Sequence, residues 1–218
     1  MNFTIIEAAQ RSPEWFAARV GRITGSVAGD MLNKIKNGDY SAARRDLRIK
    51  LAVEQLTGVS SDDPDAWKGK DVERGMEMEP LIADAYEADQ GFLLQKTGFL
   101  QMNGFLAGCS LDGHVNDFEG IVEFKSPRPA THLAYIEARK VPTEYVAQIT
   151  HNLWVTGAKW CDFVSFSDQF PGNLDHLSFF RIRVMRDEAS IKAYETEVIK
   201  FLAEVKIKAQ ELTALRAA

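Results

Sequence analysis

The sequence predicts a mixed α/β fold of the α+β kind, and three observations indicate it. Helical patterns come first, short strand patterns follow between Phe92 and Lys125, and the remainder alternates helix, strands and helix. Helices grouped apart from strands are typical of α+β or mixed architectures. With 218 residues, 45% hydrophobic and 26% charged, the chain is expected to form one domain over residues 1–218.

The first part of the chain predicts three helices. A short helix is expected after Ser12, followed by a turn around Gly21 and a second helix near Ser26, with Thr24 and Ser26 as capping residues. A third helix ends at Gly58, because one helical face collects Tyr40, Ala43, Leu47, Leu51 and Leu56.

The middle of the chain predicts a fourth helix and then strands. Apolar residues recur at helical spacing up to Gly91, and Pro80 favours a regular helix that begins just before it. Strands separated by short glycine-containing turns follow, and the clearest is Ile121–Lys125, which lies between Gly120 and Pro127.

The last part predicts a helix, two strands and a helix. Pro142 marks the start of the first helix and Gly157 its end. Residues 161–167 and 177–185 read as strands, and an amphipathic helix is expected after Asp187.

Composition limits the possible functions. The net charge of −5 argues against a protein that wraps nucleic acid by bulk charge, although residues 34–50 carry six basic residues that form either a local basic face or an ordinary solvated helix face. Two cysteines, Cys109 and Cys161, are too few for a four-cysteine metal site and fit a reducing cytoplasm. No secretory signal or membrane-spanning segment is expected.

Three charged residues stand out around one predicted hairpin. Glu123 and Lys125 point to the same side of their strand, because side chains alternate along a strand, and Asp112 comes from the preceding strand. Such charges are either water-facing groups on an edge strand or ligands in a site for Mg²⁺ or Mn²⁺. In the second case the lysine would orient or stabilise a water that attacks a phosphate.

The order of four motifs resembles a known family. The segments "SLDG" and "IVEFKSP" resemble the PD-(D/E)XK nuclease motif, with Leu111 in place of the usual proline. Upstream, "EWFAARVGRITGS" and "RGMEMEP" resemble two further family blocks, and "EYVAQITHNLWVTG" resembles the glutamine-containing helix. Together they resemble the lambda-exonuclease-like (YqaJ-type) viral recombinase family.

The resemblance implies roles for particular residues. It implies a central mixed β-sheet flanked by helices, with metal ligands at Asp112, Glu123, the Phe124 backbone carbonyl and Glu79. It assigns Lys125 to the attacking water and Gln148 to orienting substrate or water. It also implies a 5′-phosphate pocket, made by Arg19, Ser26 and Ser110.

The resemblance also implies a function. It implies a Mg²⁺-dependent 5′-to-3′ exonuclease with two bound ions, which degrades one strand of duplex DNA during phage-type recombination in the bacterial cytoplasm. The resemblance implies assembly into a homotrimeric ring, duplex DNA with a 5′-phosphate end as substrate, and a single-strand annealing protein as partner. Two alternatives stay open: an endonuclease or a nuclease of other polarity on the same core, and an inactive DNA-binding recombination protein.

Overall fold

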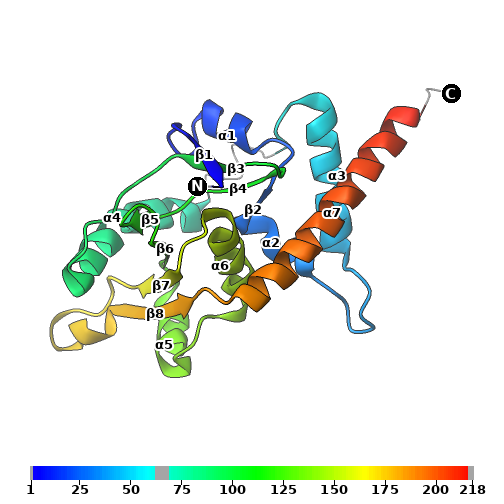
Figure 1. Ribbon diagram of the computed structural model, residues 1–218. Coiled ribbons are helices and arrows are strands. Elements are labelled where there is room, and N and C mark those ends of the chain that lie inside the picture. Colours follow the sequence, from blue (N-terminus) through cyan, green and yellow to red (C-terminus); the bar gives the residue numbers. More distant parts are fainter. Residues whose placement is uncertain (1, 62–68, 216–218) are drawn as a thin grey trace.

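The computed structural model describes residues 2–61 and 69–215 of the chain (Figure 1). None of the helices in these ranges is long and apolar enough to cross a membrane. The α-helices are α1 (Pro13–Arg19), α2 (Ala28–Leu32), α3 (Ala42–Thr57), α4 (Lys70–Gln90), α5 (Pro129–Ala138), α6 (Thr143–Thr156) and α7 (Glu188–Ala214), with short 3₁₀ turns η1 (Gly25–Val27) and η3 (Gly172–Leu177).

The strands form two four-stranded mixed sheets. The first contains β1 (Phe3–Ile6), β3 (Phe99–Met102), β4 (Ala107–Cys109) and β2 (Ile23–Thr24), in that order, and the second contains β5 (Gly113–Val115), β6 (Gly120–Lys125), β7 (Trp160–Phe166) and β8 (Phe179–Met185). Each sheet has one parallel pair, β2 with β4 and β6 with β7. The α/β class with mixed sheets and flanking helices is confirmed, and the expected central sheet is divided in two.

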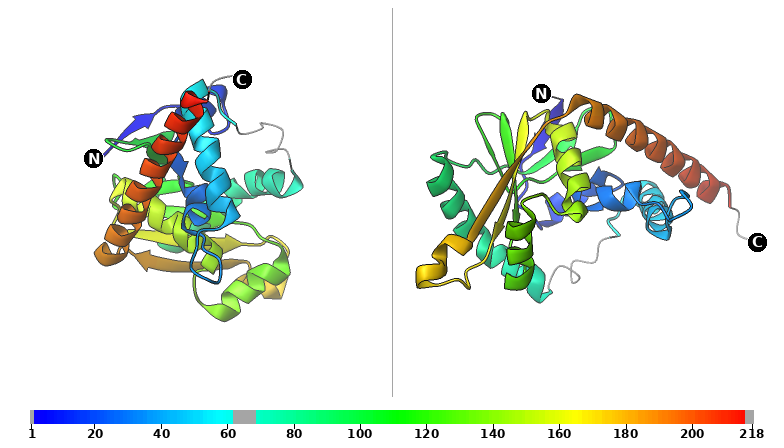
Figure 2. Two further views of the ribbon diagram at one scale, coloured as in Figure 1. Left: turned by 90° about the vertical axis from the view of Figure 1, so that its right-hand side faces the viewer. Right: turned by 90° about the horizontal axis from the view of Figure 1, so that it is seen from below.

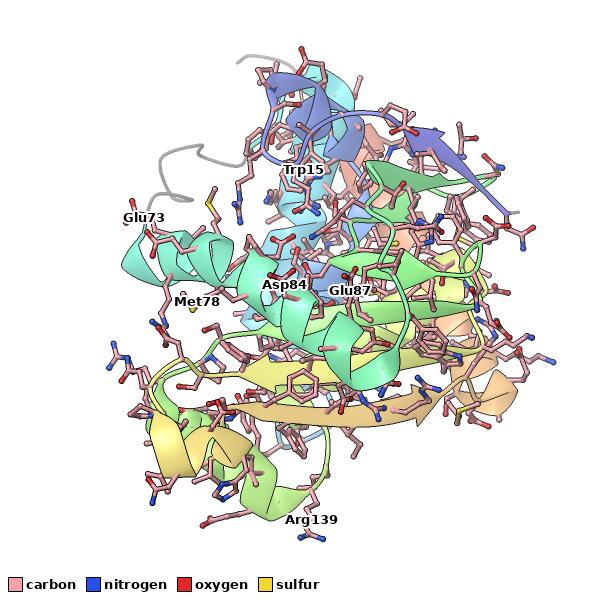
Figure 3. All side chains as sticks on the ribbon, turned by 90° about the vertical axis from the view of Figure 1, so that its left-hand side faces the viewer. Trp15, Glu73, Met78, Asp84, Glu87 and Arg139 are labelled. Carbon is pink, nitrogen blue, oxygen red and sulfur yellow. The ribbon has the colours of Figure 1, made fainter. Side chains whose placement is uncertain are left out.

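Helices cover both faces of the second sheet, so β6 is buried on each side. Val122 and Phe124 pack under α4 with Ile82, whereas Ile121 belongs to the larger core that includes Ile149 of α6. Figure 3 shows α4 lying across the front of this sheet. Glu123 shares the α6 side of β6 with Ile121, as the strand alternation predicts.

The long helix α7 packs along α3 and continues past the sheets (Figure 2). Arg44 of α3 lies in this contact, 1% exposed, and its guanidinium donates to Glu204 at 2.9 Å. One cation of the expected basic face in residues 34–50 is therefore a buried structural partner of α7.

Several predicted boundaries are confirmed by local chemistry. Gly58 and Gly157 end α3 and α6 with φ values of 68° and 73°, a left-handed conformation that glycine adopts without steric cost. Pro142 occupies the N-cap of α6, and Ser12 caps α1 by accepting the Trp15 amide hydrogen.

Other boundaries differ from the prediction. Helix α4 begins at Lys70 and runs through Pro80, because the loss of one backbone hydrogen bond does not outweigh packing on both sides of the proline. The first strand of the predicted hairpin is two strands, β4 and β5, which belong to different sheets. Thr24 and Ser26 precede or lie within η1, and neither side chain caps a helix. Helix α5 was not predicted.

Candidate metal and phosphate site

A pocket of about 260 Å³ lies where the chain passes from the first sheet to the second. Its walls come from α1, η1, the segment between β4 and β5, the end of β6, and α6. It gathers eight of the nine residues singled out in the sequence: Arg19, Ser26, Ser110, Asp112, Glu123, Phe124, Lys125 and Gln148. The break between β4 and β5 places Ser110 and Asp112 at the pocket wall.

The two carboxylates of the pocket come from adjacent chain segments. Asp112 lies just before β5 and accepts the Phe124 amide hydrogen at 2.6 Å, which ties it to β6. Glu123 is 2% exposed on β6. The hairpin pairing of β5 with β6 therefore brings the two acids together, as the sequence predicted.

Burial makes this acid pair costly. Burial, and then the nearby carboxylate of Glu123, raise the pKa of Asp112 to about 7. A carboxyl group in this state gains from any additional cation that enters the pocket.

Lys125 lies beside both acids and stays charged. Burial lowers the pKa of its ammonium, but the carboxylates of Glu123 and Asp112 raise it more, so the net pKa lies above its ordinary value. Lys125 donates to Glu123 Oε1 at 2.5 Å, and its Nζ lies 4.9 Å from the centre of the Tyr145 ring. A lysine held in this form can stabilise negative charge, but it is a poor base.

Helix α6 presents two amides to Glu123. Gln148 donates to Glu123 Oε1 at 2.6 Å, and Asn152 donates to Glu123 Oε2 at 3.2 Å. Gln148 was predicted in the site, whereas Asn152 was missed. Its position one helical turn after Gln148 was the available signal, because residues four apart share a helix face.

The other half of the pocket is built from hydroxyls and one arginine. The Arg19 guanidinium stacks 4.1 Å from the Trp15 ring centre and donates to Thr24 at 3.4 Å, and the Thr24 hydroxyl lies 3.2 Å from the Ser26 hydroxyl. Trp15 donates its indole hydrogen to the Ser110 hydroxyl at 2.8 Å. Arg19, Ser26 and Ser110 are thus linked through two neighbours into one group of donors.

The turn between Arg19 and Ser26 is held from α3. Gly21 donates its amide hydrogen to Glu54 at 2.8 Å, and its carbonyl accepts from Gln55 at 3.0 Å. Gly21 has a φ of 65°, so a side chain there would be strained as well as in contact with Gln55. These bonds fix the backbone on which the phosphate-side residues stand.

Glu79 lies outside this pocket. It lines a neighbouring groove of about 710 Å³ and is paired with Lys96, although its charge also contributes to the raised pKa of Asp112. Gln10 and Arg11 line both hollows, so the groove and the pocket adjoin.

The donor set fits a hard divalent cation. The carboxylates of Asp112 and Glu123 line one pocket, and oxygen ligands are those that Mg²⁺ and Mn²⁺ prefer. In residues 2–61 and 69–215, no three Asp, Glu, His or Cys side chains cluster closely enough to hold a metal by themselves. Asp112 and Glu123 are therefore the residues that would hold such an ion from the pocket side.

Comparison with known proteins agrees with this arrangement. The chain matches the YqaJ-like viral recombinase domain over residues 14–159, which is most of its length. This chain belongs to the YqaJ-like viral recombinase family. The comparison with curated proteins gave no match.

Solved structures of similar sequence support the family assignment. The alkaline exonuclease LHK-Exo from Laribacter hongkongensis is 33% identical, with a TM-score of 0.81 over 93% of this chain and 96% of that chain. LHK-Exo in complex with dAMP is 34% identical, with a TM-score of 0.80 over 92% and 96%. A phage related exonuclease from Haemophilus somnus 129PT, 14% identical with a TM-score of 0.60 over 88% and 95%, shares the fold. Membership of this family supports a nuclease role in recombination.

Proposed function

We propose that this protein is a Mg²⁺-dependent 5′-to-3′ exonuclease that degrades one strand of duplex DNA for recombination by single-strand annealing. The observation that carries the proposal is the shared pocket: the acids Asp112 and Glu123 and the cation Lys125 face the donors Arg19, Ser26 and Ser110. A site that holds a terminal phosphate beside hydrolytic residues suits removal of nucleotides from a phosphorylated end.

The phosphate-side residues would hold the strand terminus. A 5′-phosphate is a dianion, and the Arg19 guanidinium with the two serine hydroxyls would bind it through charge-assisted hydrogen bonds. The Trp15 ring keeps Arg19 in place and the Trp15 indole keeps Ser110 in place, so little side-chain freedom is lost on binding. Each cut would leave a new 5′-phosphate, whose capture moves the strand by one nucleotide.

The charged residues on β6 would act at the scissile bond. Lys125 is held as an ammonium between Glu123 and Asp112, so its role is to orient the attacking water and to stabilise charge on the phosphate. The family resemblance implies two bound divalent cations, either Mg²⁺ or Mn²⁺. When bound, such a cation would act as a Lewis acid and lower the pKa of a bound water. Its proposed ligands are Asp112, Glu123, the Phe124 carbonyl and Glu79.

Wider expectations belong to the same proposal. The relative LHK-Exo is known in complex with dAMP, a mononucleotide of the kind that a stepwise exonuclease releases. We propose duplex DNA with a 5′-phosphate end as substrate, a homotrimeric ring as the working assembly, and a single-strand annealing protein as partner in the bacterial cytoplasm.

Digestion of end-labelled duplexes tests the function. A blunt duplex carrying distinct labels at the 5′ and 3′ ends of one strand is incubated with Mg²⁺ or with EDTA. We expect mononucleotides from the 5′ end first, and no product in EDTA. Early release of the 3′ label would indicate the opposite polarity, and internal fragments would indicate an endonuclease. DNA binding without any product would indicate an inactive recombination protein. Each of these results would overturn the proposal.

A further inference from the structure

The two amides that α6 presents to Glu123 differ in how well they are satisfied. Gln148 and Asn152 each donate to a different oxygen of the carboxylate, at 2.6 and 3.2 Å. Only the nitrogen of an amide can donate to a carboxylate, so these contacts fix the orientation of the Asn152 amide.

The other end of the Asn152 amide carries a cost. Asn152 is 1% exposed, and no donor among the described residues reaches its Oδ1. A buried acceptor without a donor costs roughly 1–3 kcal/mol, which a residue selected only for stability would avoid. Asn152 is therefore placed for its contact with Glu123, at the expense of stability.

Gly25 gives Asn152 its room. A Cβ added at Gly25 would lie 2.5 Å from Asn152 Oδ1 and 3.3 Å from Gln148 Cγ. Gly25 is not among the glycines with positive φ, so its backbone does not require glycine. Glycine is required at this position because the neighbouring Asn152 amide leaves no room for a Cβ.

We propose that Asn152 is a positioning residue that fixes the Glu123 carboxylate for a divalent cation, with Gly25 kept small to admit it. The proposal rests on the proposed function, because the cation is what Glu123 is held for. In this proposal Asn152, which also lines the pocket, acts through its hydrogen bond to Glu123 and is not a catalytic residue. Such supporting hydrogen bonds typically change metal affinity by about 10–100-fold.

Calorimetric titration of the metal-free protein with Mn²⁺ tests the role of Asn152. Asn152→Leu and Asn152→Ala should each weaken Mn²⁺ binding by about tenfold or more. The melting temperature of metal-free Asn152→Leu should change little, since the substitution removes the orphan acceptor together with the donor. Thr150→Ala is the matched control. The Thr150 hydroxyl lies on α6 and donates to the Val146 carbonyl, so this variant should bind Mn²⁺ like wild type.

A double-mutant cycle tests the role of Gly25. Gly25→Ala alone should weaken Mn²⁺ binding several-fold, because the new methyl group displaces Asn152. In the Asn152→Ala background the same change should cost less than about twofold, since the obstructed oxygen is gone. An equal loss of Mn²⁺ affinity in both backgrounds would show that Gly25 does not act through Asn152.

The inference and the proposed function fail in different ways. Wild-type protein that neither binds Mn²⁺ nor digests DNA contradicts the proposed function. Wild-type protein that digests DNA, with Asn152 variants that bind Mn²⁺ normally, contradicts only the positioning role. If the Asn152 variants lose Mn²⁺ affinity only because they are partly unfolded, as a large fall in their melting temperature would show, then Asn152 is a packing residue and the inference is also overturned.

Discussion

The acidic half and the phosphate-side half of the pocket are stabilised in opposite ways. In the acidic half, Lys125 donates to Glu123, and Asp112 lies close to both. Burial and the Glu123 carboxylate raise the pKa of Asp112 to about 7. In the other half, Arg19 rests on an indole ring and the hydroxyls bond to neutral partners, over a turn clamped by Glu54.

The difference separates a half with buried carboxylates from a half rich in hydrogen-bond donors. The Lys125 ammonium offsets only part of the burial cost and repulsion of the two acids, since the pKa of Asp112 is still raised, so their geometry costs free energy in the metal-free protein. On the phosphate side, Arg19 stacks on Trp15 and Ser110 accepts the Trp15 indole hydrogen, so donors suited to an anion are already positioned. Substitutions should therefore affect cation-dependent steps in one half and recognition of the DNA end in the other.

Loss of either acid should have the largest effect. Glu123→Gln or Asp112→Asn should lower cleavage at least about 1,000-fold, roughly 4 kcal/mol in activation free energy, because an amide is a poor ligand for a hard cation. DNA binding should survive, and Asp112→Asn should bind at least as tightly because repulsion of phosphate falls. Initial rates on a labelled duplex measure this, with Asp84→Asn on the exposed face of α4 as control (Figure 3). Near-normal cleavage by either variant would exclude this site.

Loss of Lys125 should have the next largest effect and should separate rate from binding. Lys125→Ala should slow cleavage about 100-fold while Mn²⁺ affinity changes little, since the ammonium acts mainly in the transition state. Lys125→Arg should rescue poorly, because a planar guanidinium does not replace a compact ammonium. Rates and calorimetry on the same preparations decide the matter. Parallel loss of rate and metal would make Lys125 a structural partner of the acids.

Arg19→Ala should affect the phosphate side alone. Wild-type protein should digest a 5′-phosphorylated duplex faster than the 5′-hydroxyl form, and the variant should lose about tenfold on the phosphorylated substrate only. Arg45→Ala, an exposed arginine of α3, is the control for general DNA contacts and should leave the ratio unchanged. A ratio that Arg19→Ala does not alter would remove the phosphate pocket from the model of function.

The pH dependence of metal-free stability tests the acidic half without DNA. The folded pKa of Asp112, about 7, lies above its unfolded value of about 3.9, so its stabilising contribution is complete below pH 4 and is lost as the pH rises through 7. Asp112→Asn should therefore stabilise the metal-free protein more at pH 8 than at pH 5. The difference should be on the order of 2 kcal/mol, or roughly 4–8 °C in melting temperature, after allowance for partial exposure. Thermal unfolding in EDTA measures it, with the exposed Asp117→Asn as control; equal stabilisation at both pH values would contradict it.

The sequence predicts those parts of the site that depend on local pattern. Strand alternation placed Glu123 and Lys125 on one face, and Pro142 with Gly157 bounded the helix that carries Gln148. The contacts of Gly21 with Glu54 and Gln55 span more than thirty residues and have no local pattern. The proline in α4 gave a misleading local signal, because packing against β6 outweighed it.

The division of the strands into two sheets was also beyond local pattern. "AGCSLDGHV" reads as one extended run, yet the run leaves one sheet at Cys109 and enters the other at Gly113. The sheet that each half joins also contains partners far away in the sequence, such as Ile23 of β2, which pairs with Ala107, and Trp160 of β7, which pairs with Gly120. Asn152, by contrast, could have been predicted from local pattern, because it lies four residues after Gln148 on the same face of α6.

The span of chain between contact partners sets the order in which the site can be completed during synthesis. Gln10 donates to the Leu111 carbonyl and Trp15 to Ser110, across 101 and 95 residues. At a ribosomal rate of about 5–20 residues per second, the N-terminal segment waits roughly 5–20 s for these partners to emerge. His151 of α6 bonds to Gly108 of β4 and to Tyr194 of α7, so the wall behind the acids is closed only when the last helix arrives. A nascent chain that has not reached α7 thus lacks one of the contacts that hold the α6 wall of this pocket, and the pocket takes its final form only after α7 has been made.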